Sequence, residues 1–225
     1  MRLLAIDTAT PRIVAGIVEV SGDRVTDIAT RSHAGATAHA EILAPSIAEV
    51  ADEAGMTLAE LDGVVTGLGP GPFTGLRVGI VTAAALGDAL GLPVWGVCSL
   101  DALAPDAGST LVVTDARRKE VYVARYDGVR RVFGPAVLAP ADLVADAAAV
   151  DRVIHAGADK YLDVIGELGP VSERFPTPSG LVEVALRDGL VGGASTALQP
   201  IYIRRPDAAE PKARPALDTI GPTGR

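Results

Sequence analysis

Two short apolar runs, each ending in an aspartate, constrain the fold of this chain more than any other feature. The first is RLLAID at residues 2–7, and the second is TLVVTD at residues 110–115. Apolar runs of this length, bounded by turn residues, are typical of buried strands. Each run is followed by two further apolar runs and then by helical patterns. The sequence therefore predicts one structural unit that occurs twice. The predicted strands are 2–7, 13–20, 24–32, 61–67 and 93–98 in the first copy, and 110–115, 120–126, 130–133 and 152–157 in the second.

Helical patterns fill the connections between these strands. Apolar residues recur at helical spacing over residues 39–54, where Pro45 is expected to kink the helix. A second helix is predicted over residues 75–90, with Thr74 as its N-cap and Gly91 as its end. Ser99 is predicted to cap a short helix. The second copy is expected to contain helices in residues 140–148, 158–167 and 179–188.

The element order β-β-β-α-β-α-β-α, present twice, predicts the α/β architecture of the actin, sugar-kinase and Hsp70 superfamily. Each of the two tandem lobes should contain a mixed sheet, and the second copy is the more degenerate. We expect an N-terminal lobe over 1–104, a C-terminal lobe over 105–205, and a proline-rich tail over 206–225 that is disordered.

Charge and cysteine content narrow the classes of function. The 225 residues carry a net charge of −8, which disfavours a stand-alone nucleic-acid binder because phosphate contacts need Lys and Arg. The single cysteine, Cys98, lies in an apolar run and suits a reducing compartment. Charged residues near the N-terminus do not fit a signal peptide, and no uncharged run is long enough to span a bilayer. These observations predict a soluble cytoplasmic protein.

The stretch GLGPGPFTGLRVG, residues 67–79, raises the question of a phosphate-binding loop. A Walker A loop requires Lys and a hydroxyl residue directly after its last glycine, whereas Gly75 is followed by Leu76 and Arg77. The two prolines also remove backbone donors. We therefore interpret the loop as a structural turn that aims the following helix. The residues assigned to this structural loop are Gly69, Gly71, Thr74, Gly75 and Arg77.

Few side chains are candidates for chemistry. Asp7 and Asp115 stand where the superfamily places its magnesium-organising carboxylates, but the neighbouring loops lack the glycines of a working phosphate site. We interpret both as vestigial nucleotide-site residues and leave weak nucleotide binding open. The three histidines, His33, His39 and His155, form no pair with metal-ligand spacing. No catalytic residue, cofactor or metal site is predicted.

The helix over residues 75–90 is apolar nearly all round, with Arg77 and Asp88 as its only charges. Gly79, Ala83 and Gly87 lie four residues apart and would let another backbone approach closely. This face could pack against the helix's own sheet, which is the commoner arrangement. In a two-lobed protein of this size, however, a helix that is apolar on all sides favours a protein partner.

Several segments together resemble the TsaB (YeaZ) family. They are LLAIDTAT, HAEILAPSI, VVTGLGPGPFTGLRVGIVTAAALGDALGLPVWGVCSLDALA, VVTDARRKEVYVARY and IYIRR, so the resemblance extends to about residue 205. It implies an actin-like fold and a non-catalytic subunit. Its catalytic relative TsaD transfers a threonylcarbamoyl group to the adenosine beside the anticodon of tRNAs that read codons starting with A. This chain has no histidine where TsaD has a metal motif.

The resemblance also implies partners. TsaB proteins pair with TsaD through two helices of the first lobe, and TsaE, an ATPase, joins the pair. We expect a homodimer when TsaD is absent, contact with tRNA only through the complex, no cofactor and no membrane association. A small-molecule kinase of the same superfamily is the alternative. The predicted partner interface consists of Leu43, Ile47, Val50, Leu76, Gly79, Ile80, Ala83, Ala84 and Gly87.

Overall fold

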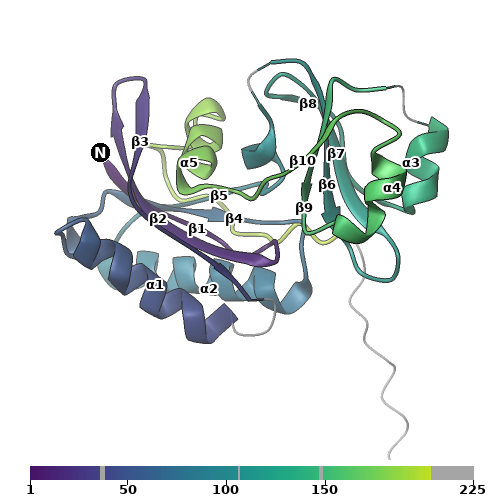
Figure 1. Ribbon diagram of the computed structural model, residues 1–225. Coiled ribbons are helices and arrows are strands. Elements are labelled where there is room, and N and C mark those ends of the chain that lie inside the picture. Colours follow the sequence, from purple (N-terminus) through teal and green to yellow (C-terminus); the bar gives the residue numbers. More distant parts are fainter. Residues whose placement is uncertain (36–38, 106, 147–148, 204–225) are drawn as a thin grey trace, which may run out of the picture.

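The computed structural model describes residues 1–35, 39–105, 107–146 and 149–203, and contains two five-stranded sheets (Figure 1). The predicted tail over 206–225 lies outside the described residues. The first half contains β1 (Arg2–Asp7), β2 (Arg12–Ser21), β3 (Arg24–Ala34), α1 (His39–Glu53), η1 (Leu58–Glu60), β4 (Gly63–Gly67), α2 (Phe73–Leu90), β5 (Val94–Val97) and η2 (Asp101–Leu103). The second contains β6 (Ser109–Asp115), β7 (Val121–Asp127), β8 (Arg130–Leu138), α3 (Pro140–Asp146), β9 (Arg152–Ala156), η3 (Asp159–Tyr161), α4 (Leu162–Ile165), β10 (Val171–Glu173) and α5 (Pro178–Arg187).

The two sheets have the same strand order. The first runs β3-β2-β1-β4-β5, and the second, read from its opposite edge, runs β8-β7-β6-β9-β10. In both sheets the first two pairs are antiparallel and the others are parallel, so each is mixed. The predicted duplication and α/β fold class are confirmed. The short strand β10 was not predicted from the sequence.

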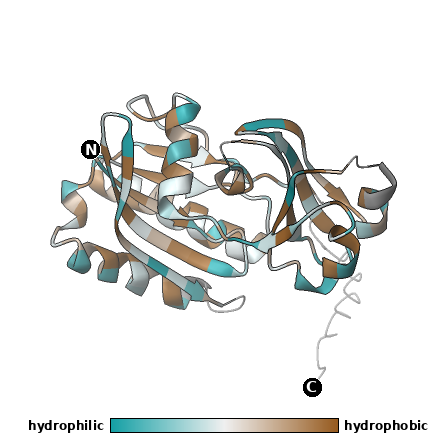
Figure 2. Ribbon diagram, turned by 45° about the horizontal axis from the view of Figure 1, so that its top comes forward, coloured by the Kyte–Doolittle hydropathy of each residue, from teal (hydrophilic) through white to brown (hydrophobic). Residues whose placement is uncertain are grey.

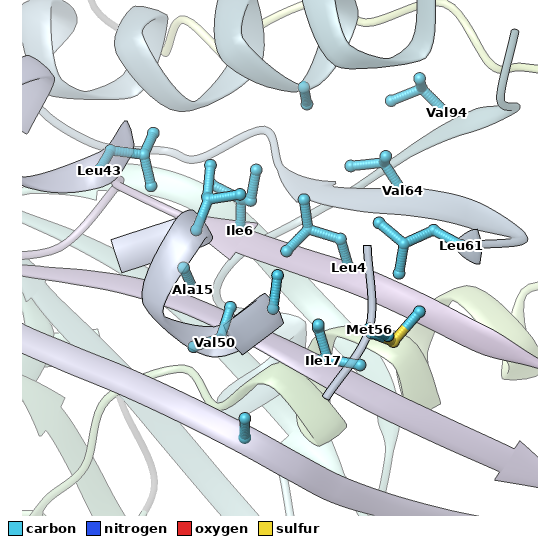
Figure 3. Close-up of a cluster of buried hydrophobic side chains, with 14 of the residues drawn as sticks. Leu4, Ile6, Ala15, Ile17, Leu43, Val50, Met56, Leu61, Val64 and Val94 are labelled. Atoms are coloured by element: carbon cyan, nitrogen blue, oxygen red, sulfur yellow. The ribbon is translucent and has the colours of Figure 1, made fainter. Parts of the chain in front are cut away.

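The first sheet packs against apolar clusters on both of its faces. Successive residues of β1 point to opposite sides of the sheet, so each face receives part of this strand. Leu4 and Ile6 face α1 and α2, where they pack with Leu43, Val50 and other apolar side chains (Figure 3). Leu3 and Ala5 face the opposite side. In Figure 1, α1 and α2 lie below this sheet and α5 lies above it. Strands that are covered on both sides read as continuous apolar runs, which is how RLLAID appears in the sequence.

Helix α5 follows the second sheet in sequence but packs on the first. Leu181 and Val182 are fully buried in the cluster that contains Leu3 and Val65. The chain then stays with the first sheet, since the Thr196 amide donates to the Val94 carbonyl (2.9 Å). The sequence pattern placed this helix in the second copy. Its apolar face instead covers the side of the first sheet that α1 and α2 leave open. The lobe boundaries at 104 and 205 remain a proposal.

The second sheet is covered by shorter elements. One face packs against α3, α4 and the residues after β9, with Leu143, Val153 and Ile165 in its core. The other face packs on η2 of the first half, through Leu100 and Leu103. Figure 2 shows hydrophobic residues gathered in the strands of both halves. The packing of η2 therefore joins the two halves through a shared apolar cluster.

A buried polar contact joins the halves at the same place. Asp101, in η2, accepts hydrogen bonds from the Tyr126 hydroxyl (2.7 Å) and from Nη1 of Arg131 (3.0 Å). Asp101 is 8% exposed and Tyr126 is fully buried. Since a buried carboxylate is costly without partners, these two donors keep η2 attached to the second sheet.

Candidate functional site

Asp7 is completely buried at the end of β1 and is fully engaged by its own chain. Its Oδ1 accepts from the amide of Ala9 (3.0 Å), and its Oδ2 accepts from the hydroxyl of Ser99. The Ser99 hydroxyl in turn accepts from the amide of Gly69 (3.2 Å). Ser99 therefore does not cap a helix as predicted. It links the first aspartate to the glycine loop.

Burial dominates the electrostatics of Asp7. Removing the carboxylate from water raises its pKa from 3.8 to about 6, although the hydrogen bonds from Ser99, Ala9 and Thr10 act in the opposite direction. A carboxyl in this setting accepts a proton readily. In the described structure, both of its oxygens already have partners within the chain.

The glycines of the loop permit close approach to the segment after β1. A Cβ on Gly67 would lie 1.8 Å from Oδ2 of Asp7, and one on Gly71 would lie 2.2 Å from the carbonyl oxygen of Ala9. Gly79, the seventh residue of α2, is as close to Thr8, because a Cβ there would lie 2.4 Å from the Thr8 Oγ1. These glycines therefore serve internal packing, as expected for a structural loop rather than a phosphate site.

Thr8 fastens the start of α2 to β1. Its hydroxyl donates to the carbonyl of Gly75 (2.7 Å) and accepts from the amide of Gly79 (3.1 Å). The helix begins at Phe73, with Pro72 at the N-cap, so Thr74 is exposed and is not the cap that the sequence predicted. The reason is that proline's fixed backbone already suits the residue before a helix. At the other end, Gly91 adopts the left-handed conformation and ends α2 as predicted.

Asp115, the equivalent aspartate at the end of β6, has different surroundings. Its Oδ1 lies 2.9 Å from Nζ of Lys160 and accepts from the amide of Arg117 (3.2 Å). Its side chain is 14% exposed. Lys160, four residues after the end of β9, thus forms an ion pair with the second aspartate.

A small cavity of about 240 Å³ lies between the two aspartate-bearing segments. It is lined by Ala9, Thr10, Pro11, Pro72, Thr114, Asp115, Arg117 and Gly157. A Cβ on Gly157 would lie 2.4 Å from Cγ of Pro11, so the two segments are in close contact there. Sites for small molecules usually have volumes of roughly 300 to 1,000 Å³. Asp7 is absent from this lining, and therefore the two predicted vestigial residues do not face a common cavity.

The residues predicted as the partner interface lie mostly inside the chain's own core. Leu43, Val50, Leu76 and Ala83 are at most 1% exposed, and Ile47, Gly79, Ile80 and Gly87 are also buried. Only Ala84 among the nine is exposed. The small residues of α2 pack on the parent sheet, because periodicity identifies an apolar face without saying what covers it. The faces of α1 and α2 that remain accessible are therefore not the ones named from the sequence.

The accessible faces of these helices are nevertheless apolar in part. On α2, Val81 is 63% exposed, and Ala84 and Ala85 are exposed. On the neighbouring helix α1, Ala44, Pro45 and Ala48 are exposed as well. The two helices contact each other under the first sheet. We call these six residues the outer helix face; they are Ala44, Pro45, Ala48, Val81, Ala84 and Ala85.

One end of α2 carries a stacked aromatic cluster. The Phe73 and Tyr202 rings are 5.2 Å apart and stacked, and the Arg77 guanidinium lies 3.7 Å above the Phe73 ring. Nε of Arg77 also donates to the Tyr202 hydroxyl (2.8 Å). Arg77 was predicted as a structural residue of the loop. Here it holds the segment after α5 against the start of α2.

Helix α2 is also long and apolar enough, by length and composition, to match a membrane span, with a mean hydropathy of 1.3. A third of it is buried against the chain itself. The buried residues of α2 contact β4 and β1, while Val81, Ala84 and Ala85 make the accessible side of the helix apolar as well.

Comparisons with known proteins agree with this geometry. The protein family described as "TsaD: tRNA N6-adenosine threonylcarbamoyltransferase" matches residues 32–178. An uncharacterised protein of Mycobacterium tuberculosis is 50% identical over 215 residues, which cover 92% of this chain and 93% of that protein. The tRNA threonylcarbamoyladenosine biosynthesis protein TsaB of Escherichia coli is 35% identical over 56% of this chain and 55% of its own.

A solved structure described as YeaZ from Pseudomonas aeruginosa superposes with a TM-score of 0.72 at 26% identity, covering 89% of this chain and 99% of its own. The two sheets of equal strand order, the two aspartates that are engaged within the chain, and these matches together indicate one class of protein. The chain belongs to the family described as TsaD, in its TsaB/YeaZ branch. The resemblance seen in the sequence is therefore confirmed.

Proposed function

We propose that this chain is a non-catalytic subunit in the synthesis of threonylcarbamoyladenosine in tRNA, and that it acts in the cytoplasm by binding and activating TsaD. The observation that carries the proposal is the membership of the TsaB/YeaZ branch, whose relatives in Escherichia coli, Haemophilus influenzae and Bacillus subtilis are described as tRNA threonylcarbamoyladenosine biosynthesis proteins. TsaE is the proposed third member of the complex. The net charge of −8 supports contact with tRNA through the partner rather than directly.

The surroundings of the two aspartates support a subunit without its own active site. Both oxygens of Asp7 accept hydrogen bonds from within the chain, and Asp115 is paired with Lys160. Pro11 lies against Gly157 where the two halves meet. A small-molecule kinase, the alternative function, would need these carboxylates to be free to organise a nucleotide and its cation. Calorimetry with ATP and Mg²⁺ tests the alternative, and micromolar binding that is lost in Asp115→Asn would favour it.

The outer helix face is the surface that we propose for TsaD. It presents alanine, proline and valine side chains on two adjacent helices, and its small residues allow a partner helix to come close. In the absence of TsaD the same face would pair with a second copy. This assignment replaces the buried residues named from the sequence, where a charge such as Ala83→Glu would disrupt the core rather than an interface.

Co-expression with TsaD of the same organism tests the proposal. The double variant Val81→Glu, Ala84→Glu should fold, because both positions are exposed, yet lose co-purification with TsaD and reduce threonylcarbamoyl transfer to tRNA. Ala141→Glu, at an exposed position on α3, is the matched control and should behave like the wild-type chain. Full recovery of TsaD with the double variant would reject the outer helix face. Transfer at full rate without this chain would reject the function itself.

A further inference from the structure

A group of metal-ligating side chains lies far from the outer helix face, beside β9. His155, on β9, Asp159, in η3, and Glu173, on β10, each bring one ligand atom to a common point, and these atoms all lie within 4.8 Å of one another. His155 and Glu173 are register partners on adjacent parallel strands, and Asp159 follows β9 by three residues. Three elements therefore converge on one place; Figure 1 shows β9 and β10 as neighbouring strands of the second sheet.

The histidine of this group lacks a partner that its burial requires. His155 is 4% exposed, and its Nδ1 is buried without a hydrogen bond from any part of the chain that the structure describes. Buried polar atoms are almost always hydrogen-bonded, so an unpartnered imidazole nitrogen needs an explanation. When an imidazole ring binds a metal through one nitrogen, its other nitrogen commonly donates a hydrogen bond to a carboxylate, a carbonyl or water.

The two carboxylates have no cationic partner in the part of the chain that the structure describes. Among the described residues, neither Asp159 nor Glu173 forms an ion pair, although they lie close enough to repel each other. Lys160, the neighbouring base, is 2.9 Å from Asp115 and is thus occupied elsewhere. Two exposed carboxylates and a buried imidazole that face one another without a positive charge favour a bound cation.

We propose that His155, Asp159 and Glu173 form a binding site for a divalent transition-metal cation, and that Zn²⁺ is the ion that suits it. Imidazole selects transition metals over Mg²⁺ and Ca²⁺, which prefer oxygen ligands alone. Around a tetrahedral Zn²⁺, ligand atoms are roughly 3.4 Å apart. The three ligand atoms lie within 4.8 Å of one another, so the exposed carboxylates of Asp159 and Glu173 would have to move closer when the ion binds. Three protein ligands leave a fourth position for water.

A cation there would hold together the edge of the second sheet. β10 has three residues and pairs only with β9 among the described strands. Coordination by one residue from each of β9, η3 and β10 would fix this short edge strand against the rest of the sheet. The pattern escaped the sequence because it contains a single histidine, and its third ligand comes from a strand that was not predicted.

Titration of the full chain with ZnCl₂, after removal of metals with a chelator, tests the site. We expect one Zn²⁺ per chain, a higher melting temperature with Zn²⁺ than with Mg²⁺, and a shift of the His155 ring resonances in NMR spectra. Asp159→Asn and Glu173→Gln should each weaken Zn²⁺ binding by at least about tenfold, the scale on which even second-sphere partners of metal ligands act. Both positions are exposed, so the variants should fold.

Two matched controls separate this site from others. Asp163→Asn removes a nearby exposed carboxylate on α4, and His33→Gln removes a histidine on β3; both variants should bind Zn²⁺ as the wild-type chain does. The proposal is overturned if Asp159→Asn and Glu173→Gln keep wild-type affinity. It is also overturned if His33→Gln abolishes binding, or if the wild-type chain binds no Zn²⁺ at about 100 µM, far above the dissociation constant of a structural zinc site.

Discussion

Asp7 and Asp115 end equivalent strands of the two sheets, but their environments differ. Asp7 is fully buried and accepts hydrogen bonds from Ser99 and Ala9, whereas Asp115 is partly exposed and faces Lys160. Equivalent positions in two sheets of the same strand order therefore hold carboxylates that are stabilised in different ways, by buried hydrogen bonds at Asp7 and by an ion pair at Asp115. The difference shows that a duplicated position predicts where a residue lies, while burial and neighbours decide its chemistry.

The largest loss of stability is expected from a substitution at Gly67, which packs directly against the Asp7 carboxylate. In Gly67→Ala, the added Cβ would lie 1.8 Å from Oδ2 of Asp7, and neither buried group can move freely. We expect a loss of about 3 kcal/mol in unfolding free energy, the upper end of the range for overpacked cores. Urea denaturation measures it. Gly35→Ala is the control, because its Cβ would meet the flexible ends of Ile42 at 3.1 Å and Ile13 at 3.6 Å. Equal stability of the two variants would contradict the close packing at Asp7.

Asp101 tests how firmly the two halves are joined. Asp101→Ala would leave the Tyr126 hydroxyl buried without its acceptor and would remove the ion pair with Arg131. We expect a loss of about 2 kcal/mol, since an unsatisfied buried donor costs roughly 1 to 3 kcal/mol. Tyr126→Phe should lower the unfolding free energy by less, because it removes the buried hydroxyl itself and leaves no donor without an acceptor. Thermal unfolding of both variants checks the order, and a larger loss in Tyr126→Phe would contradict it.

The pH dependence of stability should separate the two aspartates. Burial raises the pKa of Asp7 in the folded chain to about 6, above its ordinary value of 3.8. Between these values the folded chain keeps a proton that the unfolded chain has released, so stability falls as pH rises from about 4 to about 6. The shift corresponds to about 3 kcal/mol, so Asp7→Asn, which removes the buried charge, should raise the unfolding free energy above pH 6. The Asn side chain keeps one acceptor oxygen where Asp7 has two, and this loss reduces the net gain to about 2 kcal/mol.

Asp115→Asn provides the comparison. It should change stability by less than about 1 kcal/mol, because its partner Lys160 is 53% exposed. Urea denaturation of the wild-type chain and both variants at a series of pH values is the measurement. If Asp7→Asn showed the same pH dependence as the wild-type chain, the assignment of the falling stability to Asp7 would fail.

The smallest expected effect is the rate at which a thiol reagent modifies Cys98. This rate is a measure of how firmly the two halves stay in contact, because Cys98 is buried between them. It lies in the apolar cluster that joins η2 to the second sheet, and burial raises the pKa of its thiol to about 12. The thiolate is the reactive form, so we expect no modification of the folded chain by a thiol reagent at pH 8. Modification at the same rate in the folded chain and in urea would show that the halves separate readily.

Much of this architecture could be predicted from the sequence because its strands are short, apolar and bounded by turns. RLLAID and TLVVTD each gave a strand at the predicted residues. The interpretation of the glycine loop as a structural turn stays a prediction, and the close contacts of Gly67 and Gly71 with the segment after β1 are consistent with it. Local patterns of this kind depend on neighbours in the chain, and the sequence displays them directly.

What could not be predicted depends on contacts between distant segments. The apolar residues of α2 at Gly79 and Ala83 proved to face the parent sheet, and a periodic pattern does not say what lies opposite it. Ser99 follows a strand and resembles a helix cap, yet its hydroxyl bonds to Asp7, 92 residues away. The convergence of His155 and Glu173 likewise required the pairing of β9 with a three-residue strand.

The return of α5 to the first sheet has a consequence for the order in which the chain can mature during its synthesis. Leu3 and Ala5 are translated long before Leu181 and Val182, the α5 residues that pack in the same cluster. One face of the first sheet must therefore stay open, or be held by a chaperone, while the residues between β5 and α5 are translated. Helix α5 covers this face, so folding of the first sheet is completed only after the second sheet has been translated.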